Sequence, residues 1–169
     1  SISSGVTNIF STGNAFAALK SDGSVVTWGS SNGGADSSTV SSSISSGVTN
    51  IFSTQQAFAA LKSDGSVVTW LNLNGGDSST VSSSISSGVT NIFSTQQAFA
   101  ALKSDGSVVT WGNSSKGGNS STVSSSISSG VTNIFSNAYA FAALKSDGSV
   151  VTWGSSSYGG SSSTVSSSI

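Results

Sequence analysis

Residues 15–28 read AFAALKSDGSVVTW, and this stretch decides the fold because the chain contains it four times. Identical copies occupy residues 57–70, 98–111 and 140–153. Successive copies begin 42, 41 and 42 residues apart, and the glycine that opens GVTNIF returns with the same spacing. A fixed period of this length indicates a repeat architecture. Four units account for essentially the whole 169-residue chain.

Each unit predicts a meander of four short strands. In the first unit these are GVTNIFS (5–11), AFAALK (15–20), SVVTWG (24–29) and, more weakly, STVSSSI (38–44). The Asp-Gly pair between the second and third strands is a strong hairpin signal, because glycine accepts the positive φ of such turns. Helix is the competing interpretation of AFAALK, since Ala and Leu favour it. The segment is short and continues directly into the turn, so we expect a strand.

The second strand of each unit predicts how neighbouring units pack. Side chains alternate across a strand, so Ala15, Ala17 and Leu19 should share one face and Phe16 the other. The small alanine side chains would let neighbouring sheets approach closely. Each copy must offer the same surface if each buries its face against the next copy.

A repeated four-stranded meander marked by Trp predicts an all-β fold, a β-propeller of four-stranded antiparallel blades. A β-solenoid and a β-sandwich are the alternatives. We expect a single domain, 1–169, with blades near 1–44, 45–85, 86–127 and 128–169. The expected structural residues are the tryptophans and the hairpin glycines: Trp28, Trp70, Trp111, Trp153, Gly23, Gly65, Gly106 and Gly148.

The composition argues against several classes of function. Hydrophobic residues make up 35% of the chain and the net charge is −1, unlike a disordered chain. The chain contains no His, Cys or Arg, so it lacks the common general base, the thiol nucleophile and a phosphate-binding stripe. There is no long apolar run for a membrane span. We therefore expect no catalytic residues, no metal or cofactor, and neither nucleic acid nor membrane as partner.

One aspartate and one lysine recur in every unit. Asp22, Asp64, Asp105 and Asp147 each follow a lysine by two residues. A ring of carboxylates could bind cations, but the favoured interpretation is a hairpin aspartate that bonds its own backbone. The preceding lysines are interpreted as solvated strand ends.

The pattern GVTNIF…AFAALKSDGSVVTWG…GG resembles the regulator-of-chromosome-condensation repeat, in its serine-rich bacterial form. The resemblance covers all four units and implies a propeller, usually of seven blades. Eukaryotic members carry a His in the second strand and a Gly-Gln-Leu-Gly motif after the Trp-Gly. Here the His is absent and the later motif is reduced to Gly-Gly. Guanine-nucleotide exchange, the family's best-known activity, is therefore not carried over. The near-identical units also resemble designed symmetric propellers.

Four units predict an incomplete ring. A half ring leaves two uncovered blade faces, each complementary to the other. Head-to-tail contact between such faces gives a closed ring if the rotation fits and an open polymer if it does not. We expect two chains to complete an eight-bladed homodimeric ring. A closed four-bladed monomer, open fibres and a fragment of a longer array are the alternatives.

The copies differ at two loops, which an up-and-down blade places at the same end. The A–B loop joins the first and second strands (residues 12–14 in the first unit), and the C–D loop follows the third strand (29–35). Loops on a rigid scaffold often carry recognition, although unconstrained drift also explains the variation. Leu71 and Leu73 are expected on one face, exposed or in a contact between chains, and the two tyrosines are plausible anchors. The predicted binding face comprises Asn14, Gln55, Gln56, Leu71, Leu73, Gln96, Gln97, Lys116, Tyr139 and Tyr158.

The favoured function is a non-catalytic, self-associating propeller scaffold, either designed or excised from a bacterial surface or secreted protein. The alternative is a lectin-like or protein-interaction module that uses the A–B and C–D loop face, with a glycan or protein ligand. An exchange-factor-like regulator is a third possibility by family analogy. A natural protein of this kind would be extracellular or on the cell surface, and a designed one would be produced in a recombinant cytoplasm.

Overall fold

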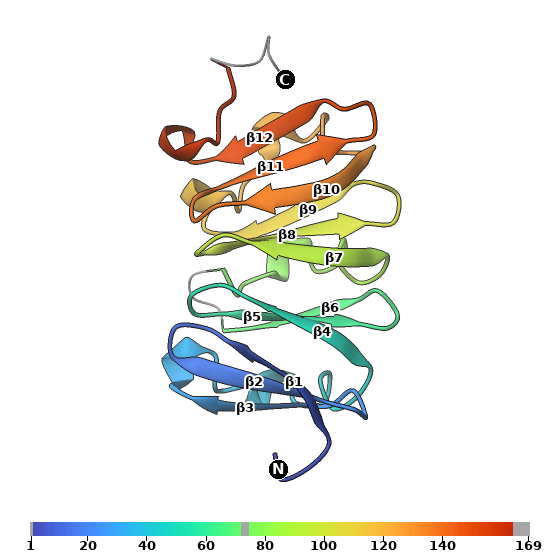
Figure 1. Ribbon diagram of the computed structural model, residues 1–169, viewed down its shortest axis with the longest axis vertical. Helices are drawn as coiled ribbons and strands as arrows, with labels where there is room; N and C mark the ends of the chain where they lie inside the picture. Colours follow the sequence, from blue (N-terminus) through green and yellow to red (C-terminus); the bar gives the residue numbers. More distant parts are fainter. Residues whose placement is uncertain (1, 72–74, 164–169) are drawn as a thin grey trace.

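The computed structural model describes residues 2–71 and 75–163, which form four antiparallel sheets of three strands each. The sheets lie one above the other along the longest axis, in chain order from one end of the stack to the other (Figure 1). We call the sheets units 1 to 4 in chain order. Their strands are β1 (Val6–Ser11), β2 (Ala15–Lys20), β3 (Val25–Gly29), β4 (Val48–Ser53), β5 (Phe58–Lys62), β6 (Val67–Trp70), β7 (Val89–Ser94), β8 (Ala98–Lys103), β9 (Val108–Gly112), β10 (Val131–Ser136), β11 (Ala140–Lys145) and β12 (Val150–Gly154).

The three strong strand predictions of each unit are confirmed, including AFAALK as a strand rather than a helix. In unit 1 the register pairs Phe16 with Trp28 and Ala18 with Val26, so these side chains share one face of the sheet. Phe16 and Trp28 stack with ring centroids 5.4 Å apart. The equivalent rings stack at 5.2 to 5.3 Å in the other units.

The predicted fourth strand of the blade is wrong in the described units. The STV segments form short 3-10 turns instead: η2 (Ser38–Val40), η3 (Ser79–Val81) and η5 (Ser121–Val123). Serine and aspartate side chains compete for the backbone there. Asp36 accepts a hydrogen bond from the Ser38 N–H, and the Ser41 hydroxyl donates to the Ser38 carbonyl. The fourth copy of this segment lies mostly outside the described residues.

The C–D loops carry three further 3-10 turns within the described residues: η1 (Ser31–Gly33), η4 (Ser114–Lys116) and η6 (Ser156–Tyr158). No helix in the part of the chain that the structure describes is both long and apolar enough to cross a membrane.

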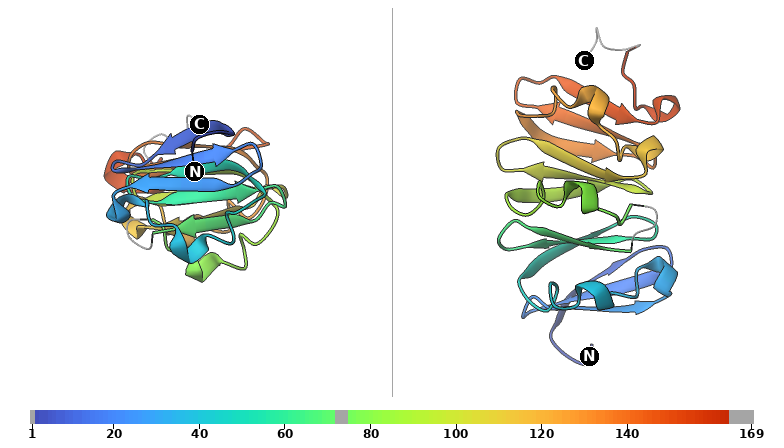
Figure 2. Two further views of the ribbon diagram at one scale, coloured as in Figure 1. Left: turned by 90° about the horizontal axis from the view of Figure 1, so that it is seen from below. Right: turned by 180° about the vertical axis from the view of Figure 1, so that it is seen from behind.

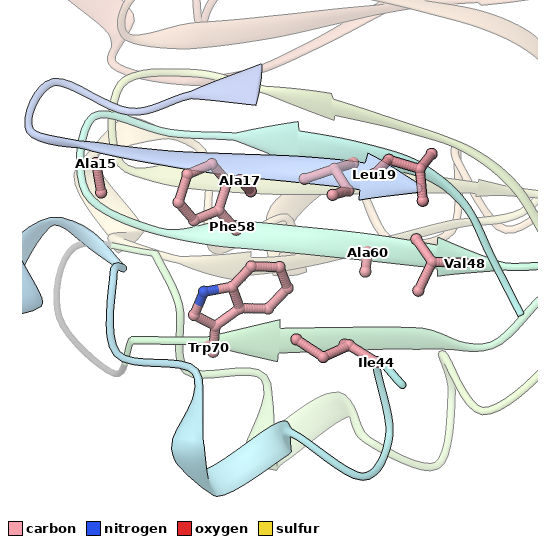
Figure 3. Packing of buried hydrophobic residues seen from close by; sticks show 9 residues of the cluster. Ala15, Ala17, Leu19, Ile44, Val48, Phe58, Ala60 and Trp70 are labelled. Atoms are coloured by element: carbon pink, nitrogen blue, oxygen red, sulfur yellow. The ribbon is translucent and has the colours of Figure 1, made fainter. Parts of the chain in front are cut away.

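The core lies between consecutive sheets, as the alternation in the second strand predicts. Between units 1 and 2, the β2 face of Ala15, Ala17 and Leu19 packs against Phe58 and Trp70. Figure 3 shows the Trp70 indole lying beneath the alanine face of β2. Equivalent clusters lie between units 2 and 3 and between units 3 and 4. Burial of apolar area at ~25 cal/mol per Å² makes each of these clusters a principal source of stability.

Hydrogen bonds tie each unit to the next along the first strands and their loops. The Ser53 hydroxyl donates to the Ser11 carbonyl at 2.7 Å, and the Ser136 hydroxyl donates to the Ser94 carbonyl at 2.7 Å. At the opposite edge, the Val48 N–H donates to the Gly23 carbonyl at 3.0 Å. The view from behind shows the same order of sheets, from unit 1 at one end to unit 4 at the other (Figure 2). The chain is therefore an open stack, and the closed four-bladed monomer is not its arrangement.

Candidate functional site

The N-terminal end face of the stack is the surface of unit 1 formed by Ile9, Phe16 and Trp28. Ile9 is 55% exposed and Phe16 is 45% exposed. Their equivalents in unit 2, Ile51 and Phe58, are 2% and 0% exposed because unit 1 covers them. The N-terminal end face is thus an interface surface that lacks its neighbour.

The C-terminal end face is the opposite surface, formed in unit 4 by Phe135, Ala140, Ala142 and Leu144. Phe135 is 56% exposed. A hollow of about 200 Å³ lies here, and its lining includes Phe135, Ala140, Ala142 and Gly159. In the internal interfaces this position receives the aromatic pair of the following unit.

The surroundings of three equivalent glycines show that the C-terminal end face has room for an aromatic ring of another unit. A methyl group on Gly34 would lie 2.8 Å from the Phe58 ring, and one on Gly117 would lie 2.6 Å from the Phe141 ring. A methyl group on Gly159 would have the Asn137 amide nitrogen as its nearest described neighbour, at 3.9 Å. The C-terminal end face therefore has space where the internal interfaces hold a phenylalanine ring.

Tryptophan completes the internal contact. The Trp70 indole N–H donates to the Gly34 carbonyl at 2.8 Å, and the Trp153 indole N–H donates to the Gly117 carbonyl at 3.1 Å. By the repeat, a head-to-tail contact would bring Trp28 of one copy to Gly159 of the next. Sequence reasoning chose the tryptophans as structural residues but missed these glycine acceptors, because a hydrogen bond to a backbone carbonyl leaves no side-chain signal.

The A–B and C–D loops lie together along one edge of the stack, as predicted. The Thr95 hydroxyl donates to the Lys116 carbonyl at 2.9 Å, and the Asn137 amide donates to the Tyr158 carbonyl at 2.8 Å. The A–B loops also bond to one another, with the Gln55 N–H donating to the Gln96 carbonyl at 3.0 Å. We call this edge the loop edge.

Three of the predicted binding residues meet on the loop edge, at the boundary of units 3 and 4. The Lys116 ammonium lies 3.6 Å from the centroid of the Tyr139 ring, and the Tyr139 and Tyr158 ring centroids are 4.3 Å apart. Tyr158 is 54% exposed. We call Lys116, Tyr139 and Tyr158 the aromatic cluster. Its members come from the C–D loop of unit 3 and both loops of unit 4.

The other predicted residues do not join this cluster. Asn14 and Gln55 are exposed elsewhere on the loop edge, where Gln56 and Gln96 are half-buried. The Gln97 side-chain carbonyl accepts a hydrogen bond from the Asn113 amide at 2.9 Å, a partner that sequence reasoning missed.

The prediction for Leu71 as an outward residue is wrong. Leu71 is half-buried and packs against the core between units 2 and 3. Leu73 lies outside the described residues.

The aspartates of the hairpins act locally, as the favoured interpretation holds. The Asp64 carboxylate accepts from the Ser66 hydroxyl at 2.6 Å and from the Ser66 N–H at 2.9 Å. These bonds from Ser66 lower the pKa of Asp64 below its ordinary value. Among the described residues, no three His, Cys, Asp or Glu side chains are grouped to hold a metal ion.

The lysines that end the second strands have partners in three units. Lys62, for example, donates from Nζ to the Ser43 carbonyl at 2.9 Å, and thereby ties its strand to the connector before its own unit. Lys103 and Lys145 make the equivalent bonds to Ser84 and Ser126. These bonds are exposed, so the lysines are solvated strand ends that also hold the preceding connector.

Comparisons with known proteins give a fold and no family. No protein-family model matches the chain. No curated protein sequence matches it either.

Solved structures of low sequence identity are similar to the chain. Yeast RCC1 (Prp20) bound to Kap60 is 19% identical with a TM-score of 0.60, over 88% of this chain and 43% of that one. Prp20p from Saccharomyces cerevisiae, described with its binding to Gsp1p and histones, is 19% identical with a TM-score of 0.59, over 88% and 44%. The receptor kinase CR4 ectodomain from Physcomitrella patens is 18% identical with a TM-score of 0.54, over 89% and 39%.

The chain spans less than half the length of each of these structures. At such identities the likeness concerns the fold alone. It shows that the four sheets are arranged as in RCC1-like propeller repeats.

Proposed function

We propose that the chain is a non-catalytic scaffold that self-associates head to tail through its two end faces. The proposal rests on one observation: the same phenylalanine of the repeat is exposed in unit 1 and fully buried in units 2 and 3. Phe16 is 45% exposed, whereas Phe58 and Phe99 are both 0% exposed at the same position of their units. Exposed apolar patches of this kind mark interaction sites.

The occupant that fits each end face is a second copy of this chain. The C-terminal end face repeats the alanine surface that receives Phe58 and Trp70 between units 1 and 2. Hydrogen-bonding groups recur as well, since the Gly148 carbonyl of one copy would stand to the Val6 N–H of the next as the Gly23 carbonyl stands to Val48. Two copies closing an eight-bladed ring would satisfy both faces of each chain, whereas an open fibre would leave only its two ends uncovered.

The experiment measures mass in solution by native mass spectrometry and sedimentation velocity. The wild type should appear at twice the 16.6 kDa chain mass if the ring closes. Phe16→Glu blocks the N-terminal end face and Ala142→Glu blocks the C-terminal end face. Each variant alone should be a monomer, because every head-to-tail contact needs one intact face of each kind. An equimolar mixture of the two should form a dimer, since it still has one compatible pair of faces.

Tyr158→Ser is the matched control, because it changes the loop edge and leaves both end faces intact. It should keep the wild-type mass. Circular dichroism of both blocked variants should match the wild type, which shows that a change in mass is not a loss of fold. A monomeric wild type at high micromolar concentration, or an Ala142→Glu variant that still dimerises, contradicts the proposal. Masses far above a dimer support the fibre over the ring.

A second candidate function is recognition of a glycan or protein ligand at the loop edge. The aromatic cluster supports it, because a cation over a tyrosine face beside a second, exposed tyrosine combines rigid contact area with charge. The test compares the wild type with a variant in which residues 137–139 become Thr-Gln-Gln, as in units 2 and 3, and Lys116 becomes Ser. A glycan array and a binding screen should show ligands of the wild type that the variant loses. Equal binding by both proteins would remove this candidate.

A further inference from the structure

The C-terminal end face carries an acceptor that two internal boundaries use. The Gly34 carbonyl accepts from the Trp70 indole at 2.8 Å, and the Gly117 carbonyl accepts from the Trp153 indole at 3.1 Å. Gly159 is the equivalent glycine of unit 4. Gly34 and Gly117 are buried, whereas Gly159 is exposed and no described residue donates to its carbonyl. This end face therefore presents an exposed glycine with an unused carbonyl where a covered boundary receives an indole N–H.

The hollow of about 200 Å³ on the C-terminal end face lies beside this glycine. Ala142 is half-buried there, whereas its equivalents Ala17, Ala59 and Ala100 are fully buried under the following unit. An apolar cavity of roughly 150 Å³ already admits a benzene ring. The hollow therefore has room for one small aromatic molecule. Its lining includes Phe135, Ser136, Asn137, Ala140, Ala142 and Gly159.

The polar side chains of this lining are engaged within the chain. The Asn137 Oδ1 accepts from two backbone N–H groups of its own loop, at 2.8 and 2.9 Å, and its Nδ2 donates to the Tyr158 carbonyl at 2.8 Å. The Ser136 hydroxyl donates to the Ser94 carbonyl at 2.7 Å. The Gly159 carbonyl has no described donor, and a carbonyl can only accept. A ligand that completes the hollow must therefore supply a donor at Gly159.

The charge of the lining selects a neutral ligand. No charged side chain lines the hollow among the described residues. An ionised ligand would lose water there without gaining a partner of opposite charge, which is unfavourable. A neutral aromatic ring loses little solvation and gains contact with the alanine face.

The internal boundary between units 1 and 2 shows which aromatic group satisfies such a surface. Figure 3 shows Phe58 and Trp70 against the alanines of β2, where the two rings stack with centroids 5.2 Å apart. The rings supply apolar area, and the indole N–H supplies the donor for Gly34. A single indole molecule combines both properties, because it is a flat apolar ring with one N–H donor.

We propose that the hollow binds a small neutral indole, with the ring against Ala142 and the N–H donating to the Gly159 carbonyl. The consequence rests on the proposed function: the bound indole would occupy the position that Trp28 of a second copy takes in a head-to-tail contact. Indole would therefore cap the chain and oppose self-association. The binding itself needs only the C-terminal end face of one chain.

The experiment titrates indole into the ¹⁵N-labelled Phe16→Glu variant and follows its ¹H–¹⁵N correlation spectrum. This variant has a blocked N-terminal end face, so no second copy competes for the hollow. The backbone signals of Ala142, Gly159 and Gly160 should shift saturably, with a Kd on the order of 1 mM for a ligand of this size. The signal of Gly23, in the hairpin of unit 1, should stay in place. Contacts between the indole ring protons and the Ala142 methyl should appear in a nuclear Overhauser spectrum.

Two comparisons test the ring and the donor separately. Benzofuran has the same shape as indole with an oxygen in place of the N–H, and it should bind about fivefold more weakly, the effect of one net hydrogen bond. Ala142→Glu fills the hollow and should lose indole binding, while unchanged signals from units 1 and 2 show that it is folded. Tyr158→Ser changes the neighbouring loop edge and should keep the affinity.

The failure of this inference can be told apart from failure of the proposed self-association. If the wild type forms dimers, indole should lower the dimer fraction in sedimentation velocity. A monomeric wild type that binds indole as described would contradict self-association and support this site. The site is overturned if indole does not shift the signals of Phe16→Glu, if benzofuran binds as tightly as indole, or if Ala142→Glu keeps the binding.

Discussion

The Trp153 indole N–H donates to the Gly117 carbonyl at 3.1 Å, and the two residues belong to adjacent units. One tryptophan therefore does two things: it fills the space between the sheets, and it satisfies a backbone carbonyl of the preceding loop. The sequence around each tryptophan is almost the same. A difference in stability between equivalent variants therefore reports on the adjacent unit rather than on the tryptophan itself.

Trp153→Phe should destabilise the protein more than Trp111→Phe does. Both changes remove similar ring area from positions that are 2% exposed, but only the first leaves a carbonyl without its indole donor. The expected difference in the free energy of unfolding is about 1 kcal/mol, the net contribution of one hydrogen bond. Urea unfolding followed by circular dichroism measures it. Equal losses would show that the Trp111 indole has an acceptor after all.

Gly65→Ala should cost more stability than Gly148→Ala. Both glycines sit in the same hairpin turn with positive φ, 77° and 84°, so the backbone strain of an alanine is nearly equal. A methyl group on Gly65 would lie 2.8 Å from the Gly88 nitrogen of the next unit, whereas one on Gly148 would have no described atom within 4 Å. The added overlap should lower the free energy of unfolding by about 1–3 kcal/mol beyond the shared strain. Thermal unfolding of the two variants side by side, below the concentration at which copies associate, checks this order.

Stability should fall in acid as the hairpin aspartates protonate. Hydrogen bonds from Ser66 lower the pKa of Asp64 below its ordinary value of 3.8, and the corresponding serines lower that of Asp22, Asp105 and Asp147. A lowered folded-state pKa contributes stability above the unfolded value, and this stability is lost as the pH falls through the folded one. The free energy of unfolding should therefore be flat near neutral pH and decline below about pH 4.

Asp64→Asn provides the control for this pH dependence, because the amide oxygen can still accept from Ser66 but cannot titrate. The variant should lose part of the acid-dependent decline and keep the hairpin. A decline of unchanged size would mean that the hairpin carboxylates do not cause it.

Lys116 and Tyr139 should be energetically coupled. The ammonium lies 3.6 Å from the ring centroid, a geometry that gives about 0.5–1 kcal/mol at an exposed site. A double-mutant cycle with Lys116→Met and Tyr139→Leu isolates this coupling in unfolding experiments. A coupling indistinguishable from zero would show that the two side chains do not interact in solution.

The sequence alone determined the strands, the hairpins and the faces that pack. Alternation along AFAALK placed Ala17 on the face that packs against the next unit and Phe16 on the opposite face, because the period of a strand is a local property of the chain. The resemblance to propeller repeats rested on the same local pattern, and the structural comparisons agree with it at the level of the fold.

The fourth strand failed because local chemistry overrode the repeat. Val40 sits in a serine-rich segment whose side chains bond the backbone, as Ser41 bonds the Ser38 carbonyl, and the chain turns instead of extending. The expectation for Leu71 failed as well. Its position looked like an outward loop, yet its side chain packs against the core between units 2 and 3.

Only the tertiary structure decided which copies of an identical stretch are covered and which are bare. Phe16 and Phe58 have the same local sequence, but one is exposed and the other fully buried. Trp111 and Trp153 likewise share their stretch, but only Trp153 finds an acceptor. The physical reason is that burial and hydrogen-bond satisfaction belong to the contact between two units, and a residue's own neighbours in the chain do not specify what lies across that contact.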